Sequence, residues 1–413
     1  MGSKKRKILI IVQTLSNGGV EKVASIIANN LNSEVKIILY ENKVTYKNNL
    51  KKIILDSPPS SNYLFKFIRF IKRVWNVRKI KNTENPDYVI SFSDGPNLVN
   101  ILSKTKEKVI ISIHSNKSNT KGEGKIAHFI YRLFYKKFYN KADSIVCVSK
   151  GVRDDLINNF NISTNKTTVI YNPIDFNEIR EKEKERIENY LKPVFNNKVI
   201  ITAGRLTEQK GQWHLIRSFR KIKEKIPNSK LVLLGDGELK EYLIKLSKNL
   251  GLKVYSSWTD DKNKAKNADV LFLGFVKNPF KYFKNSYLFT LPSLCEGFGV
   301  VITEAAACSL PVVSSDCNSG PREILAPNTD LNQKIKKTEF ADFGILIPVS
   351  SGVMYKSNHL LTEIENQWSE IINNLLLEDK ENIKKYKEAS IKRAKDFSID
   401  VIIQKWEKLL NNV

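Results

Sequence analysis

One stretch of sequence decides the fold that we expect of this chain: Pro292-Ser-Leu-Cys-Glu296-Gly-Phe-Gly-Val-Val-Ile-Thr-Glu304-Ala-Ala-Ala-Cys308. An apolar run over residues 287–291 leads into it, and a second apolar run over 311–315 follows it. A strand, a glycine-containing turn, a helix and another strand in this order form one parallel β/α unit. The stretch therefore predicts an open α/β sheet, in which ligands bind beyond the carboxyl ends of the strands.

Two carboxylates, Glu296 and Glu304, lie in the expected loop and in the expected helix of this unit, with seven residues between them. Ionised carboxylates only accept hydrogen bonds, so a pair of them suits the hydroxyl groups of a sugar. Gly297 and Gly299 would let the main chain approach a ligand, and the free N–H groups that open the helix would face an anion. The common alternative is that both glutamates belong to a solvated helix face.

The composition indicates a protein with an anionic partner. The chain has 413 residues, with 68 Lys and Arg against 43 Asp and Glu, for a net charge of +25. Such a charge suits nucleic acid, a membrane surface or a phosphorylated substrate. There is no apolar signal region and no run of about 18 apolar residues that could span a membrane. The four cysteines have no metal-ligand spacing, so we expect a reduced cytoplasmic protein in which they pack as small core residues: Cys147, Cys295, Cys308 and Cys317.

Strand-like apolar runs alternate with helical patterns through both halves of the chain, which predicts two parallel, doubly wound sheets. The first half has such runs at residues 7–13, 34–40, 87–93, 108–114, 143–149 and 168–171. The second has them at 199–203, 230–234, 270–275, 287–291, 311–315 and 344–348. Pro173 disfavours helix for the residue before it and so marks a boundary. A Lys/Glu-rich helix is expected at 176–191, and three helices at 358–377, 380–394 and 398–410 close the chain. We therefore expect domains at 1–172 and 173–395, facing each other across a cleft, with residues 396–413 packing back on the first.

Two stretches in the first half, 63–75 and 129–139, combine Lys and Arg with aromatic residues and lack acids. Basic, aromatic helices of this kind suit the surface of an anionic membrane. The alternative is a stripe that faces the core, opposite a solvated Lys/Arg face. The acidic doublets Asp154-Asp155 and Asp260-Asp261 are interpreted as surface charge.

Two glycine-containing turns carry candidate phosphate ligands. The second half opens with Ala203-Gly-Arg-Leu-Thr-Glu-Gln-Lys-Gly211, in which Arg205 and Lys210 leave the end of a strand. The planar fork of Arg and the compact charge of Lys suit a diphosphate, although a solvated pair is ordinary in a basic protein. Gly18-Gly19 lies between the first strand and the first helix, without the spacing of a dinucleotide fingerprint, so it is either a phosphate cradle or a tight turn.

Taken together, these elements resemble the retaining GT-B glycosyltransferases of glycosyltransferase family 4, and the resemblance covers essentially the whole chain. It rests on Gly18-Gly19-Val20-Glu21, on Gly204-Arg205-Leu206 with Lys210-Gly211, on Leu234-Gly-Asp-Gly-Glu238, on Phe272-Leu-Gly-Phe275, and on Glu296 with Glu304. The segment Ser319-Gly-Pro-Arg-Glu-Ile-Leu325 is similar to a bacterial subgroup that builds lipopolysaccharide, capsule and lipid-linked oligosaccharides.

The resemblance implies roles for the charged residues. Arg205 and Lys210 would hold the donor diphosphate and stabilise the leaving nucleotide, so that no metal ion or other cofactor is needed. Glu296 would hold the hydroxyl groups of the transferred sugar and favour its developing positive charge. Glu304 would accept hydrogen bonds from the ribose. His114, at the end of a strand, matches a family position beside the donor sugar, although such a histidine is more often structural.

Further roles implied by the resemblance involve main-chain groups and the base. The backbone at Phe298 and Gly299 would line the sugar and phosphate, and Phe275 with Val276 would meet the base. Gly18-Gly19 would approach the phosphates when the cleft closes.

The function that we expect is transfer of a sugar from a nucleotide sugar to a glycan or lipid-linked acceptor at the inner face of the cell membrane, without nucleic acid as a partner. The donor would be a UDP-linked hexose or N-acetylhexosamine. Alternatives are a GDP-mannose or other hexosyl transferase of another pathway, such as protein glycosylation, and a non-catalytic basic protein that binds membranes or nucleic acid.

Three segments depart from the family pattern. Residues 253–267 lengthen the connection before the strand at Val270, close to the expected base-binding edge, where they either affect nucleotide selection or form a loop without a role. Residues 327–342 are also longer and polar. Pro321-Arg322 occupies a turn where many relatives carry another glycine, which raises the question of whether this turn contacts phosphate.

Overall fold

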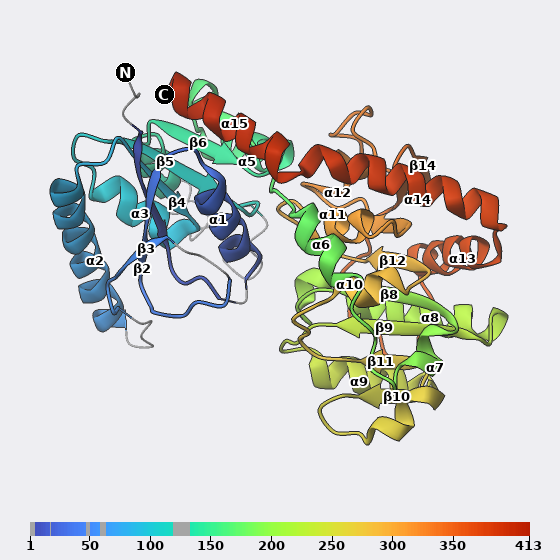
Figure 1. The fold of residues 1–413 in the computed structure, drawn as a ribbon. Coiled ribbons are helices and arrows are strands. Elements are labelled where there is room, and N and C mark those ends of the chain that lie inside the picture. Colours follow the sequence, from blue (N-terminus) through green and yellow to red (C-terminus); the bar gives the residue numbers. More distant parts are fainter. Residues whose placement is uncertain (1–4, 17, 47–49, 58–62, 119–132) are drawn as a thin grey trace. The chain divides into compact units, whose positions relative to one another are not determined.

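The computed structural model describes residues 5–16, 18–46, 50–57, 63–118 and 133–413, and its contacts divide the chain into two compact units. The first unit comprises Met1–Pro173 together with Phe397–Val413, and the second comprises Ile174–Asp396. Each unit is built on its own parallel sheet with helices on both faces (Figure 1). The predicted α/β class, with two doubly wound sheets in one chain, is confirmed.

The sheet of the first unit has the strand order β3-β2-β1-β4-β5-β6-β7, and all of its strand pairs are parallel. Its central strands are almost completely buried, as expected of strands that are covered on both faces. The strands are β1 (Lys7–Val12), β2 (Glu34–Leu39), β3 (Lys51–Ile54), β4 (Tyr88–Phe92), β5 (Lys108–Ile113), β6 (Ser144–Cys147) and β7 (Thr167–Val169).

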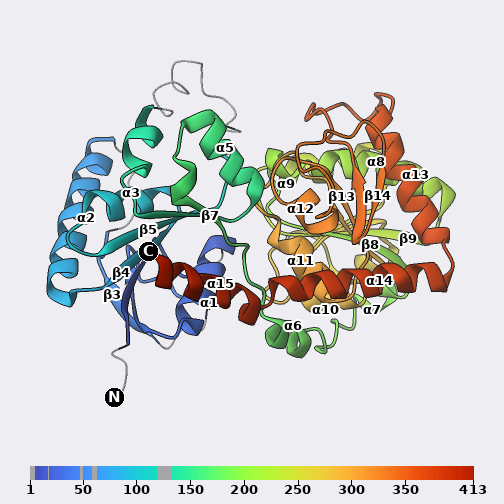
Figure 2. The same ribbon diagram turned by 90° about the horizontal axis from the view of Figure 1, so that it is seen from above.

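Alternate residues of β1 pack into two separate cores, one on each face of this sheet. Ile8, Ile10 and Val12 face helix α1 (Gly19–Asn30) and the last helix, α15 (Ile399–Asn412). Leu9 and Ile11 face α2 (Tyr63–Glu84) and α3 (Asp94–Leu102). Helix α15 lies beside α1 (Figures 1 and 2). Residues 133–139 are also helical, and α5 (Lys150–Phe160) and the 3-10 turn η1 (Thr164–Lys166) precede β7.

The sheet of the second unit has the order β10-β11-β9-β8-β12-β13-β15-β14, parallel except for β14, which pairs antiparallel with β15. The strands are β8 (Lys198–Ala203), β9 (Ser229–Leu234), β10 (Val254–Ser256), β11 (Val270–Phe272), β12 (Leu288–Leu291), β13 (Val312–Ser315), β14 (Glu339–Ala341) and β15 (Gly344–Ile347).

One face of the second sheet carries a large apolar core with two buried tryptophans, Trp213 and Trp368. This core is closed by α8 (Gln212–Lys225), α9 (Lys240–Asn249) and α13 (Glu363–Leu377), and by Ile383 near the start of α14 (Lys380–Ala394), which otherwise packs along α11. Helices α6 (Phe176–Lys182), α10 (Phe280–Lys284) and α11 (Val300–Ala307) pack on one another, and Phe283 of α10 contacts Phe289 of β12 edge to face, 5.5 Å apart. The remaining elements are α7 (Lys192–Phe195), α12 (Pro321–Leu325), η2 (Glu208–Lys210), η3 (Lys262–Asn267) and η4 (Lys395–Phe397).

Two expectations about individual elements were wrong. The helix expected over 176–191 ends at Lys182, because the following chain turns inward, burying Ile187 and Leu191, and Glu188 accepts a hydrogen bond from Tyr282 at 2.9 Å. The helix expected from 358 begins at Glu363, where Thr362 and Glu365 form a capping box. The segment 253–267, whose role was left open, contains edge strand β10 and η3.

Candidate active site

The candidate site lies at the carboxyl-end edge of the second sheet, where β8 and β12 are neighbours. The loop after β8 carries Arg205 and Lys210, and the loop after β12 carries Glu296. Carboxyl ends of parallel strands meet at one edge of a sheet, so pairing of β8 with β12 is enough to bring these loops together.

Two hydrogen bonds to main-chain carbonyls join the loops to each other. The Leu294 N–H donates to the Gln209 carbonyl at 2.8 Å, and the Gln209 side-chain amide donates to the Cys295 carbonyl at 2.9 Å. Gly211 adopts φ +59°, and a Cβ placed on it would lie 2.5 Å from the Pro292 carbonyl oxygen. A larger residue at 211 would therefore push the loops apart.

Lys210 and Glu296 form an ion pair between these loops. Lys210 Nζ lies 2.5 Å from Glu296 Oε1, and the Ser293 hydroxyl donates to the same oxygen at 2.7 Å. The Glu296 side chain is 7% exposed and that of Lys210 16% exposed. The aliphatic part of Lys210 passes over Gly204 (φ +153°), where a Cβ would lie 3.2 Å from Lys210 Cε. A cation and a carboxylate are thus held side by side with little freedom to move.

Arg205 is exposed at the same edge. Within the described residues, its guanidinium makes no hydrogen bond or ion pair. Its main chain is fixed, because the Gln212 side-chain amide donates to the Arg205 carbonyl at 2.9 Å. The guanidinium can therefore turn toward an anion beside Lys210 without breaking an internal contact.

The start of α11 is shaped by backbone contacts rather than by side chains. Gly299 caps the helix with φ +84°, and Glu304 lies in the helix on its partly exposed side. Phe298 is 2% exposed, so its main chain rather than its ring is available to a ligand. A Cβ on Gly320 (φ +103°) would lie 2.0 Å from the Phe298 carbonyl oxygen, so the two backbones are in close contact there.

Phe275 and Val276 follow β11, at the same edge of the sheet but on the other side of β9. Phe275 is 61% exposed, which is unusual for a large aromatic side chain next to a buried strand. An exposed ring here offers a surface for another flat ring.

Gly18, Gly19 and His114 belong to the first unit, at the carboxyl-end edge of its own sheet. Gly18 caps α1 in an extended conformation, and a Cβ on Gly19 would meet nothing within 4 Å, so packing inside the unit does not require glycine at 19. His114 Nε2 lies 2.9 Å from the Ser112 hydroxyl. Desolvation, with the charge of Lys117 as a second cause, lowers the pKa of His114 to about 3, so its ring is neutral at physiological pH.

The structure shows the surroundings of two further charged residues. The Arg322 side chain is 5% exposed and is paired with Asp316 at 2.8 Å and Glu339 at 2.9 Å, so its charge is engaged within the fold. Asp155 was expected at the surface, but it is buried and accepts the Lys117 N–H at 2.6 Å, which ties down the segment after His114.

The cysteines give no sign of nucleophilic chemistry. None of the four forms a disulfide, and burial raises the pKa of the Cys147 thiol to about 12 and that of the Cys317 thiol well above its usual value. Within the ranges that the structure describes, no group of three or more His, Cys, Asp or Glu side chains is placed to hold a metal ion. Over the same ranges, no helix is both long enough and apolar enough to cross a bilayer.

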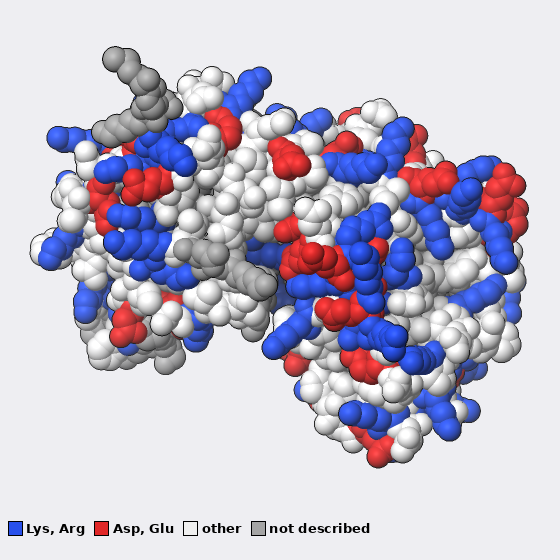
Figure 3. All heavy atoms as spheres, viewed as in Figure 1, with Lys and Arg blue, Asp and Glu red and all other residues white. Residues whose placement is uncertain are grey.

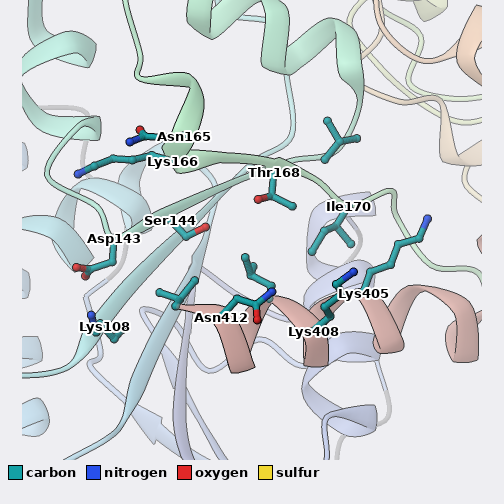
Figure 4. Close-up of a pocket in the computed structure, with 13 residues that line it drawn as sticks. Lys108, Asp143, Ser144, Asn165, Lys166, Thr168, Ile170, Lys405, Lys408 and Asn412 are labelled. Atoms are coloured by element: carbon teal, nitrogen blue, oxygen red, sulfur yellow. The ribbon is translucent and has the colours of Figure 1, made fainter.

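A cavity of about 630 Å³ lies elsewhere, between α15 and strands β5 to β7 of the first unit (Figure 4). Two of its charged groups form bonds within the fold: Lys166 Nζ donates to the Ala142 carbonyl at 3.0 Å, and Asp143 pairs with Lys104 at 2.7 Å. None of the predicted site residues lines it. The lining residues are Lys108, Asp143, Ser144, Asn165, Lys166, Thr168, Val169, Ile170, Lys405, Lys408, Leu409, Asn412 and Val413.

Sequence reasoning missed the residues that hold the site together. Ser293 had no signal, because a serine in a loop is ordinary until its hydroxyl is seen on Glu296. Gln209 joins the loops through a side-chain bond to a backbone carbonyl, which no spacing rule reveals. Gly235 and Gly237 were given no role of their own, although both lie inside a motif that the sequence analysis quoted, Leu234-Gly-Asp-Gly-Glu238.

Two Rossmann-like parallel sheets in one chain, the second with a cationic and carboxylate edge, define the GT-B class of α/β protein. The structure of Anabaena HepE in complex with UDP has this fold, with a TM-score of 0.70, 19% identity, and coverage of 98% of this chain and 100% of that one. Family models match both parts of the chain: Glycosyltransferase Family 4 over residues 17–178 and Glycosyl transferases group 1 over 183–337.

Relatives of known sequence extend over most of the chain. An uncharacterized glycosyltransferase of Methanocaldococcus jannaschii is 35% identical over 373 residues, which is 87% of this chain and 88% of the relative. An N-acetylgalactosamine-N,N'-diacetylbacillosaminyl-diphospho-undecaprenol 4-alpha-N-acetylgalactosaminyltransferase of Campylobacter jejuni is 29% identical over 399 residues, 95% of this chain and 96% of that protein. The chain belongs to the GT-B glycosyltransferases of the family 4 and group 1 type.

Proposed function

We propose that the protein is a retaining, metal-independent glycosyltransferase that moves a UDP-linked hexose or N-acetylhexosamine to a glycan or lipid-linked acceptor in the synthesis of cell-surface polysaccharide. The observation that carries this proposal is the Lys210–Glu296 ion pair at the carboxyl-end edge of the second sheet, with Arg205 on the same loop as Lys210. A fixed cation beside a fixed carboxylate matches the two charges that develop when a sugar separates from a diphosphate.

The chemistry follows from these charges. As the bond between the anomeric carbon and the diphosphate oxygen breaks, negative charge grows on the phosphate and positive charge on the sugar. Lys210 and Arg205 stabilise the first, and Glu296 stabilises the second. Among the described residues, the contacts on Glu296 converge on Oε1, so Oε2 is left to accept from a sugar hydroxyl. Two cations beside the diphosphate supply the neutralisation that a divalent ion supplies elsewhere, which supports the proposed metal independence.

The donor and acceptor classes are proposed from the relatives. The Campylobacter relative is named as transferring N-acetylgalactosamine onto a diphospho-undecaprenol-linked saccharide, and the Anabaena protein of the same fold was crystallised with UDP. A lipid-linked acceptor would bring the enzyme to the inner face of the cell membrane.

Helix α2 supports such a peripheral location, because it has two apolar faces. One face, with Phe70, Val74 and Val77, packs on the first sheet. Away from this packed face the helix exposes Phe65, Phe67, Ile68, Ile71 and Trp75, and Trp75 is 71% exposed. Lys66, Lys72, Arg78 and Lys79 are also exposed, and Glu84 at the end is the only acid of the helix. An exposed face of aromatic, aliphatic and basic residues suits an anionic lipid surface. Residues 129–132 of the second basic stretch lie outside the described residues.

A donor screen in EDTA tests the catalytic proposal. The purified protein is incubated with UDP-glucose, UDP-N-acetylhexosamines and GDP-mannose, with and without a diphospho-polyprenol-linked acceptor, and the products are identified by mass spectrometry. We expect release of UDP, faster with acceptor, and an α-linked product by NMR from an α-linked donor. Turnover of GDP-mannose and of no UDP-sugar would show that the protein belongs to the alternative class, the GDP-mannose transferases. If the protein neither binds nor turns over any nucleotide sugar, the proposal is overturned.

A further inference from the structure

The segment 253–267, which departs from the family pattern, adds a structured turn to the end of the second sheet nearest Phe275. Its strand β10 pairs with β11 in parallel, so the chain leaves both strands at the same edge. The turn is held tightly: the Ser257 N–H donates to the Phe272 carbonyl at 2.9 Å, and Asp260 accepts the Ser256 N–H at 2.8 Å. Trp258 lies at the tip of this turn.

The Trp258 indole packs against the backbone of Gly274. Gly274 adopts φ +70°, and a Cβ on it would lie 3.2 Å from Trp258 Cζ2 and 3.4 Å from Cε2. On the ring, Lys240 Nζ lies 4.7 Å from the ring centroid, a cation–π contact that fixes the indole from the start of α9. The residue after Gly274 is the exposed Phe275. Trp258 therefore supports the main chain on which Phe275 stands.

A continuous set of close backbone contacts links this place to the ion pair. The Gly235 N–H donates to the Gly274 carbonyl at 2.8 Å, and a Cβ on Gly235 would lie 2.0 Å from the Gly204 carbonyl oxygen. Gly204 in turn lies under Lys210. In the order β10-β11-β9-β8, three strand spacings separate the two ends, roughly 14 Å along the edge. One edge thus has cations at one end and two aromatic rings at the other.

We infer that Trp258 is a positioning residue that selects the base of the donor nucleotide, an inference that rests on the proposed function. Its indole, fixed by Lys240, holds the Gly274–Phe275 backbone and limits the space beside Phe275. In this proposal the base stacks beside Phe275, where a purine, with its second fused ring, would need more room than a pyrimidine. Trp258 does not touch the diphosphate, so its effect is confined to the base.

The test separates the two ends of the site by using two probes, UDP and inorganic pyrophosphate, in isothermal titration at fixed ionic strength in EDTA. For Trp258→Leu we expect UDP affinity to fall about 10-fold, the preference for UDP over GDP to fall by a similar factor, and pyrophosphate affinity to stay unchanged. Trp258→Phe should restore most of the preference. Lys210→Met, by contrast, should weaken both probes.

Fluorescence gives a second measurement that does not depend on the stability of the leucine variant. Trp213, Trp368 and Trp406 are buried, so UDP should change the emission of Trp258 above all. The change should vanish in Trp258→Phe and persist in Trp75→Phe, which alters an exposed tryptophan of the first unit. Lys240→Met should reproduce the loss of base preference.

Each outcome has one meaning. Equal loss of UDP and pyrophosphate binding in Trp258→Leu would show a merely structural residue and overturn the inference, as would an unchanged preference between UDP and GDP. If the wild-type protein binds neither UDP nor GDP, it is the proposed function that fails.

Discussion

Lys210 and Glu296 are close enough to compensate each other, yet they have different tasks in the proposed reaction. The pair is mostly buried, so removing one partner also leaves the other charge uncompensated. Loss of activity and loss of stability must therefore be measured separately for these residues.

We predict that Lys210→Met and Glu296→Gln each lower turnover by about 10²–10³, which corresponds to roughly 3–4 kcal/mol in the barrier. The measurement is kcat with the donor identified in the screen, on variants whose thermal unfolding remains cooperative. Lys221→Met is the matched control, because Lys221 is exposed on α8 and, among the residues that the structure describes, bonds only Asn366. Near wild-type turnover in both site variants would contradict their assignment.

His114 should not titrate near neutral pH. Its pKa of about 3 in the folded protein lies below the unfolded value of about 6.5, so the unfolded chain binds more protons between these values. The free energy of unfolding therefore decreases as the pH falls from 6.5 toward 3, and this contribution is complete above 6.5.

We predict that acidification from pH 7 to 4.5 costs the wild-type protein more stability than His114→Gln, by at most about 2.5 kcal/mol. Chemical denaturation of both proteins at the two pH values gives the difference. The pH profile of kcat/KM should show no step near 6.5 that disappears in His114→Gln. Equal losses of stability in the two proteins would mean that the histidine is protonated in the fold.

For single residues, the sequence revealed those that belong to motifs, but it did not reveal the residues that bond to them. Arg205, Lys210 and Glu296 could be identified because their types and spacing match a known chemistry, and pairing of β8 with β12 then placed them together. Ser293, Gln209 and Trp258 act through contacts between distant loops, which no local pattern encodes. Asp155 was misjudged for the same reason, since its burial depends on Lys117 and Ser118.

Among the elements, the loops at the edge of the second sheet depend on glycines that allow backbones to touch. Gly235 is the clearest example. It adopts φ +134°, and the Gly204 carbonyl oxygen occupies the place that a side chain at 235 would need. Gly95, in the first turn of α3, is the opposite case, since a Cβ there would meet nothing within 4 Å.

We predict that Gly235→Ala costs at least about 1–3 kcal/mol and weakens UDP binding, because the loops on either side must separate. Gly95→Ala should be neutral or stabilising by up to about 1 kcal/mol, since alanine is the better helix former. Urea denaturation and UDP titration of both variants provide the comparison. A Gly235→Ala protein with unchanged stability and affinity would show that the loops are not in contact as described.

The exposed face of α2 gives a prediction about location. We predict that a triple change to Glu at Lys66, Arg69 and Lys72 releases the protein from anionic liposomes. The membrane-binding free energy should weaken by about 1 kcal/mol for each basic residue lost. Arg73 is left unchanged, because it donates to Ser57 at 3.0 Å and stacks on Tyr40 at 4.4 Å. Sedimentation with liposomes at several salt concentrations measures the effect.

The matched control for α2 is a triple charge reversal on α14, Lys384, Lys387 and Lys392 to Glu, which changes the net charge equally on a helix without exposed aromatic residues. Equal release by both variants would indicate nonspecific attraction by the net charge. Unchanged sedimentation of the α2 variant would exclude this face as the membrane contact.

Elements were predictable where burial leaves a long apolar run. The central strands of both sheets could be located to within a few residues for this reason. The edge strands β3, β10 and β14 were missed because each has only three or four residues. The sequences of β3 and β14 are also mixed because these strands are partly exposed, as in Lys51–Ile54. The helix over 176–191 was predicted too long, because local propensity does not show where a chain turns inward to bury Ile187.

For the molecule as a whole, the charged residues are spread over both units, whereas each unit has an apolar core of its own. The net charge of +25 is not gathered into one patch on the face shown in Figure 3, where Lys and Arg are interspersed with Asp and Glu over both units. The cores, in contrast, are separate, with Trp406 of α15 in the first unit and Trp368 of α13 in the second.

We predict that Trp406→Ala and Trp368→Ala each cost about 3–5 kcal/mol and that each destabilises its own unit. Both side chains are no more than 1% exposed. Hydrogen exchange should speed up in β1 for Trp406→Ala and in β8 for Trp368→Ala, while the other strand stays protected. Loss of protection in both strands in either variant would mean that the units unfold as one.

The return of α15 to the first sheet also sets an order of events during translation. The face of β1 that carries Ile8 and Ile10 is not fully covered until Ile402, Trp406 and Leu410 have left the ribosome. At 5–20 residues per second, the intervening second unit takes on the order of ten to fifty seconds to synthesise. During that time one apolar face of the first sheet of the nascent chain is partly exposed, and a chaperone could bind there.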